Sequence, residues 1–158
     1  MVNRKFLMSN IWHFIALGFG TGLSKKGPGT IGTLVAFLYL IPFLKLSNTL
    51  QIFLYIFCFI FSYISTNETI KNLKIKDPSC VVIDEIIAYL LILIIVPLNF
   101  LTIILSFVIF RLLDIYKPMP INFFEKIPGA AGVIADDVVA AIFTILIIWS
   151  INFYVPIY

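Results

Sequence analysis

Five stretches without a charged side chain dominate this chain of 158 residues, and they constrain its fold more than any other feature. They cover residues 31–44, 50–64, 86–96, 98–110 and 138–155. Hydrophobic residues make up 61% of the chain and charged residues 12%, about half the charged share of a soluble globular protein. Because crossing about 30 Å of hydrocarbon takes about 20 residues, we expect an all-α membrane bundle of about five short or tilted transmembrane helices.

The N-terminal region adds one more predicted helix. Arg4 and Lys5 precede the apolar stretch 11–19 as in a secretory signal, but no small-x-small cleavage site follows it. We therefore expect this segment to be retained as an interfacial or half-inserted helix. The whole chain, residues 1–158, is predicted to form a single domain because its length suits one.

The third and fourth apolar stretches allow two topologies, a long helix kinked at a proline or a hairpin that turns at residues 97–99. With the hairpin, residues 1–29, 67–82 and 114–136 lie on one side of the membrane, which then carries ten of the eleven basic residues when Arg111 is included. A single long helix would break this asymmetry. Because short loops rich in Lys and Arg stay cytoplasmic, we prefer the hairpin and expect the polar segments to face the cytoplasm.

The charge balance and the cysteine content exclude two classes of protein. The net charge of +3 arises from 11 basic and 8 acidic residues, which is too sparse for a nucleic-acid-binding surface. Two cysteines cannot form a disulfide framework. The expected surrounding is the bilayer, and no protein partner can be inferred.

Carboxylates at the edges of the apolar stretches are the strongest sign of chemistry. Five of the eight acids form three groups, Asp84 with Glu85, Asp114, and Asp136 with Asp137. One alternative is that the last pair only caps a helix N-terminus. Acids that converge at a membrane edge would repel one another without a cation. Ligation by oxygen alone suits Mg²⁺ or Mn²⁺, so we predict a divalent metal site.

Basic residues surround one of these acids. Arg111, Asp114 and Lys117 follow one another at intervals of three, so Asp114 can contact both cations in a helix. A solvated ion pair at a helix end is the simple alternative. Binding of an anion is the functional interpretation.

Besides the acidic groups, one glycine-rich segment, residues 18–33, is rich in polar residues. Gly27, Gly29 and Gly32 match the pattern G-x-G-x-x-G, but no strand precedes them, so a dinucleotide-binding loop is excluded. A glycine loop that leads into a helix offers backbone N–H groups to phosphate, with Lys25, Lys26 and Thr30 nearby. Alternatively, the glycines only shape a tight re-entry into the membrane.

The residues that are missing near the acidic motifs exclude several mechanisms of phosphate-ester hydrolysis. His13 is the only histidine and lies far along the chain from the acidic motifs, which argues against a histidine nucleophile. A cysteine phosphatase would need an arginine shortly after its thiolate, but Ile86 stands six residues after Cys80, and the chain has no D-x-D pair. Metal-assisted attack by water is the reaction type that this leaves.

Four segments together resemble the phosphatidylglycerophosphatase A family. They are GFGTGLS with GPGTIG, VVIDEI, FRLLDIYKPMPI and PGAAGVIADDV, which occur in the order of the family and cover about half of the chain. The resemblance implies a Mg²⁺-dependent lipid phosphatase that converts phosphatidylglycerophosphate to phosphatidylglycerol and phosphate. Together with the apolar stretches and the distribution of Lys and Arg, it predicts a multi-pass protein of the bacterial inner membrane with its active site facing the cytoplasm.

Carried onto this sequence, the resemblance implies an active site that contains the five acids, Arg111, Lys117 and residues 25–30. The division of these residues into the following roles is our hypothesis. The metal ligands would be Asp84, Glu85, Asp136 and Asp137. The phosphate-binding residues would be Lys25, Lys26, Gly29, Thr30 and Arg111. The catalytic residues would be Asp84, Asp114, Lys117 and Asp137, with Asp114 orienting the attacking water or protonating the leaving oxygen.

A different class of protein is also compatible with short helices that carry acids at their edges. Small ion- or proton-coupled transporters have this pattern, although the chain shows no clear internal repeat to support it. Phosphate release by the purified protein would distinguish the enzyme from the transporter.

Overall fold

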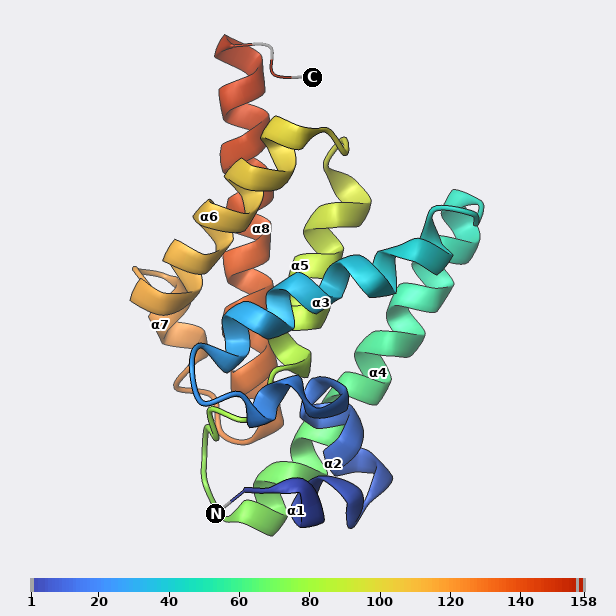
Figure 1. Ribbon diagram of the computed structural model, residues 1–158. Coiled ribbons are helices and arrows are strands. Elements are labelled where there is room, and N and C mark those ends of the chain that lie inside the picture. The colour runs from blue at the N-terminus through green and yellow to red at the C-terminus, as the bar shows by residue number, and fades with distance from the viewer. Residues whose placement is uncertain (1, 156, 158) are drawn as a thin grey trace.

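The computed structural model describes residues 2–155 and 157, and all regular structure in that part of the chain is helical. The elements in chain order are α1 (Arg4–Met8), α2 (Ile11–Ala16), the 3₁₀ helix η1 (Gly18–Leu23), α3 (Pro28–Phe43), α4 (Asn48–Leu73), α5 (Ile83–Ile95), α6 (Phe100–Tyr116), α7 (Ile121–Phe124) and α8 (Ala130–Tyr154) (Figure 1). The predicted all-α fold is confirmed.

Each of the five apolar stretches forms one long helix, namely α3, α4, α5, α6 and α8. The helices extend beyond the apolar stretches into the polar residues beside them. Asp84 and Glu85 therefore lie in the first turn of α5. Asp136 and Asp137 lie about two turns into α8, which begins at Ala130. The acids are consequently held on helices instead of loops.

Helix α5 forms the centre of the bundle. Most of its side chains are buried, and it packs against α3, α4 and α8. Figure 1 shows α5 and α8 side by side, with α3 crossing in front of them. Burial on this scale orients the helix firmly, so the first turn of α5 presents its acids in a fixed direction.

The turn between α5 and α6 has the predicted hairpin form. Asn99 caps α6 by accepting a hydrogen bond from the Thr102 backbone N–H, and the Thr102 side chain accepts one from the Asn99 N–H in return. This capping box begins a new helix after Pro97. The long kinked helix is therefore excluded, and α6 runs back along α8 (Figure 1).

The N-terminal region differs from the single predicted helix. Asn3 and Asn10 each cap a separate short helix, so the segment divides into α1, α2 and η1. The buried His13 ring bonds to Thr69 and Asn72 of α4, at 3.0 and 3.1 Å. The segment is thus attached to the C-terminal half of α4.

Two helices, α4 and α8, are long and apolar enough to cross a membrane, fewer than the five predicted. Helices α3, α5 and α6 have 16, 13 and 17 residues. A rise of about 1.5 Å per residue makes them shorter than the hydrocarbon layer. The apolar part of α4 is only 17% buried, with exposed side chains such as Leu50, Phe53 and Phe57. Such a surface suits contact with lipid.

Candidate functional site

A cavity of about 220 Å³ opens where the N-terminal parts of α3, α5 and α8 meet the C-terminal end of α6. All five acids singled out in the sequence line it. Arg111 of α6 and Lys117, the C-cap residue of the same helix, line it as well. The complete lining is Gly27, Pro28, Gly29, Asp77, Ser79, Val81, Asp84, Glu85, Arg111, Asp114, Lys117, Val133, Asp136 and Asp137. The fold therefore gathers the scattered carboxylates into one site.

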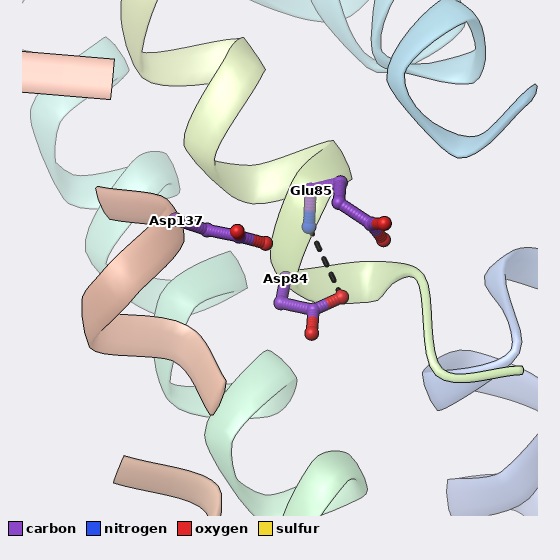
Figure 2. Close-up of side chains that lie close together, drawn as sticks. All are labelled: Asp84, Glu85 and Asp137. Atoms are coloured by element: carbon purple, nitrogen blue, oxygen red, sulfur yellow. Dashed lines mark hydrogen bonds between the residues drawn. The ribbon is translucent and has the colours of Figure 1, made fainter. Parts of the chain in front are cut away.

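Three of the acids lie close enough to share a metal ion. Asp84 and Glu85 on α5 and Asp137 on α8 each offer an oxygen atom, and these atoms lie within 4.8 Å of one another. Figure 2 shows the three side chains converging, with the Glu85 N–H donating to Asp84 Oδ1 at 3.1 Å. Neither Asp84 nor Asp137 forms an ion pair with any residue that the structure describes. A cation would relieve the repulsion within this group.

Glu85 also has an unused oxygen atom. Its Oε1 lies 3.7 Å from Arg111 Nη1, whereas Oε2 is buried and has no hydrogen-bond partner in the described part of the chain. Buried polar atoms are rarely left without a partner because the loss costs about 1–3 kcal/mol. An oxygen-binding cation at this position would supply the partner, so the donor set fits a hard divalent metal.

Arg111 stands beside the acidic group and is held in place by two contacts. Its Nη1 lies 2.5 Å from Asp114 Oδ2 and donates to Thr33 Oγ1 at 3.3 Å. The Arg111 and Asp114 side chains are only 13% and 11% exposed, so the solvated ion pair is excluded. The Arg111 Nε is buried without a hydrogen-bond partner among the described residues, which leaves one donor for an anion.

Lys117 approaches the cavity from the end of α6. It is the C-cap residue, with a left-handed φ of 42°, and its Nζ donates to Asp136 Oδ2 at 2.6 Å and lies 3.5 Å from Glu125. Burial by itself would lower the pKa of this ammonium group, but the hydrogen bond and charge of Asp136 raise the pKa overall. Asp136 is therefore paired with Lys117 and stands outside the group of three acids.

Gly29 allows α3 to approach the acids closely. A Cβ atom at this position would collide with Glu85 Oε1 and would lie 2.9 Å from Glu85 Cδ and 3.2 Å from Arg111 Nη2. The residue before Pro28, Gly27, caps α3 with a left-handed φ of 53°. Both glycines line the cavity, so the glycine-rich segment does meet the acidic residues as the sequence indicated.

The other residues of this segment predicted to bind phosphate lie outside the acidic cavity. Lys25 lines a neighbouring cavity. Lys26 is exposed, Thr30 is half-buried, and neither lines one of these two cavities. The loop thus approaches the acids through its backbone at Gly27 and Gly29 more closely than through its side chains.

Several site residues have no clear signal in the sequence. Asp77 and Ser79 line the cavity from a loop that resembles no motif, and Glu125 contacts Lys117 from the end of α7. Thr33 contacts Arg111, and only its place four residues after Gly29 in a helix could have suggested it. The idea that Asp136 and Asp137 cap α8 is wrong, because Gly129 occupies the cap.

Comparison with known proteins assigns the family. The family model for phosphatidylglycerophosphatase A matches residues 14–152. The chain is 37% identical over 160 residues to phosphatidylglycerophosphatase A of Escherichia coli strain K12, covering 99% of this chain and 92% of that protein.

Two other relatives are similar to this chain over most of its length. Phosphatidylglycerophosphatase A of Haemophilus influenzae is 32% identical over 155 residues, covering 96% of this chain and 94% of that protein. A protein of Bacteroides thetaiotaomicron described as a candidate phosphatidylinositol-3-phosphatase is 34% identical over 143 residues, covering 85% and 89% of the two chains. No solved structure matches. The chain belongs to the phosphatidylglycerophosphatase A family.

Proposed function

We propose that this protein hydrolyses the terminal phosphomonoester of phosphatidylglycerophosphate, giving phosphatidylglycerol and phosphate, with Mg²⁺ as its metal. The proposal rests on family membership and on one geometric observation. Asp84, Glu85 and Asp137 gather in a cavity that Arg111 and Lys117 also line. Carboxylates for a metal beside cations for an anion are what metal-assisted phosphate-ester hydrolysis requires. The transporter alternative has no support from the relatives.

The group of three acids is the proposed metal site. Asp84, Glu85 and Asp137 would hold Mg²⁺ through carboxylate oxygens, and the orphaned Glu85 Oε2 supports this assignment. The ion would supply positive charge to the phosphate oxygens and to the attacking water. The sequence also suggested Asp136 as a ligand. Its 2.6 Å hydrogen bond to Lys117 supports a different role, in which Asp136 positions the lysine.

The cationic side chains are the proposed phosphate-binding groups. Arg111 has an unpartnered Nε and Lys117 carries a stable positive charge, so both would neutralise charge on the phosphoryl group as it transfers. Gly27 and Gly29, at the start of α3, line the same cavity, so their backbone N–H groups would be available to the phosphate. Asp114, paired with Arg111 through Oδ2, would accept a hydrogen bond from the attacking water.

The site is proposed to lie at the cytoplasmic surface of a bacterial inner membrane. Helices α3, α5 and α6 would cross with α4 and α8, the shorter ones at a locally thinned bilayer. The substrate would keep its acyl chains in hydrocarbon while its phosphate enters the cavity at the helix ends. Basic residues near the surface would attract this anionic lipid, at about 1 kcal/mol for each Lys or Arg.

Metal removal tests the proposal most directly. We expect the purified protein in detergent to release phosphate from phosphatidylglycerophosphate, to lose this activity in EDTA, and to regain it when Mg²⁺ is added. Phosphatidic acid and phosphatidylinositol 3-phosphate serve as comparison substrates, since one relative is described by the latter activity. Full activity in EDTA would overturn the metal assignment, and absence of phosphate release from all three lipids would overturn the function.

Labelling with a membrane-impermeant thiol reagent tests on which side of the membrane each loop lies. In a variant whose Cys58 and Cys80 are replaced by serine, single cysteines at positions 74 and 126 should react only from the cytoplasmic side. A cysteine at position 45 should react only from the opposite side, because α3 and α4 place it at the other end. Reaction of positions 74 and 126 from opposite sides would contradict the proposed topology.

A further inference from the structure

A second cavity adjoins the proposed active site. Its volume is about 380 Å³, and it lies between the loop after η1 and the segment before α5. The residues that line it are Val2, Gly22, Leu23, Ser24, Lys25, Ile75, Asp77, Pro78, Ser79 and Cys80. Asp77 and Ser79 line both cavities, so the two spaces meet at this pair.

Lys25 supplies the positive charge of the second cavity. It is the one cation among the described residues that line this space, and it does not line the first cavity. It forms no ion pair with any residue in 2–155 or 157. Its ammonium group is therefore available to a bound anion, at a place separate from Arg111 and Lys117.

The rim between the cavities favours a neutral group. Asp77 is a carboxylate at the junction, and it would repel a phosphate placed directly against it. An alcohol suits this position, because a hydroxyl can donate to the carboxylate and also bond to the Ser79 hydroxyl. The order along the two cavities is thus a phosphate site with Arg111 and Lys117, a junction for hydroxyl groups, and a second anion site with Lys25.

Phosphatidylglycerophosphate has the same order of groups. Its terminal phosphomonoester is joined through a glycerol with a free hydroxyl to a phosphodiester, which carries the diacylglycerol. We propose that the second cavity binds this phosphodiester, with Lys25 as its counter-charge and with Asp77 and Ser79 against the bridging glycerol. The inference rests on the proposed function and extends it, because it makes the second cavity the part of the site that selects a lipid with two phosphates.

Product inhibition separates the two cavities. Phosphatidylglycerol contains the phosphodiester and the glycerol, whereas inorganic phosphate represents only the group in the first cavity. In Lys25→Ala, we expect the inhibition constant for phosphatidylglycerol to rise about 10-fold through loss of a charge-assisted contact, while that for inorganic phosphate stays unchanged. Lys25→Arg should restore inhibition by phosphatidylglycerol.

Lys76→Ala is the matched control, because Lys76 is an exposed lysine beside Asp77 that lines neither cavity. It should change neither inhibition constant. Equal increases for both inhibitors in Lys25→Ala, or no increase for phosphatidylglycerol, would overturn the second site. These outcomes presuppose hydrolysis by the unsubstituted protein, so a failure of the proposed function would appear separately, as absence of any turnover.

Discussion

Replacing Asp137 by asparagine is expected to abolish phosphate release while the protein folds as well as before. Asp137 is 4% exposed and faces Asp84 and Glu85 without an ion pair among the described residues. Asparagine keeps the shape of the side chain but loses the charge that a metal ligand needs. We expect turnover to fall at least about 100- to 1,000-fold, the usual cost of removing one electrostatic group from an active site.

Thermal unfolding in detergent gives a second test of the same variant, because the direction of the change in unfolding temperature distinguishes a metal ligand from a structural residue. Metal-free Asp137→Asn should unfold at the same or a higher temperature than the unsubstituted protein, because one repulsive charge is gone. Mg²⁺ should stabilise the unsubstituted protein by about 2.7 kcal/mol at 100 times its dissociation constant, and this stabilisation should vanish in the variant.

Glu68→Gln serves as the control for loss of a carboxylate, since Glu68 pairs with Lys71 on α4 at the protein surface. It should retain both turnover and the response to Mg²⁺. A stabilisation by Mg²⁺ in Asp137→Asn equal to that of the unsubstituted protein would show that the metal does not use this carboxylate.

The helices were predictable because the apolar stretches show no period-2 alternation of polar residues. This excludes a transmembrane barrel and leaves helices as the structures that can cross lipid. The turn at residues 97–99 was also predictable, since the distribution of Lys and Arg favoured it and Asn99 and Thr102 form the cap that starts α6. The division of the N-terminal segment was not predicted, although the capping residue Asn10 was visible in the sequence. The second break, between α2 and η1, falls inside the apolar stretch 11–19, where the composition does not change.

The members of the site were more predictable than their pairing. Five acids and four cations were expected in one place. The five acids line the cavity with Arg111 and Lys117, whereas Lys25 and Lys26 do not. The sequence could not show that Asp136 turns to Lys117 while Asp137 turns to α5, because neighbouring residues on a helix differ by about 100° in direction. Asp77 was not predicted, because it lies in a loop and no motif or helical spacing in the sequence indicates that this loop folds against the site.

Replacing Gly29 by alanine tests whether the close approach of α3 to Glu85 matters for the metal. The backbone should tolerate the change, because alanine stabilises a helix by about 0.5–1 kcal/mol relative to glycine. The added Cβ, however, would occupy the place of Glu85 Oε1 and crowd Arg111 Nη2 at 3.2 Å. Glu85 would have to turn away from Asp84 and Asp137. We expect the Mg²⁺ concentration for half-maximal activity to rise about 10- to 100-fold, as when the support of a metal ligand is lost.

Gly32→Ala is the matched control, one turn further along the same helix. There the added Cβ would meet the Val82 side chain at 2.9 Å and the Val82 carbonyl oxygen at 3.2 Å, but none of the carboxylates. This variant should unfold at a lower temperature and keep its Mg²⁺ requirement, whereas Gly29→Ala should regain activity when Mg²⁺ is raised. An unchanged Mg²⁺ requirement in Gly29→Ala, or an equal increase in both variants, would show that the glycine at position 29 serves helix packing and not the position of Glu85.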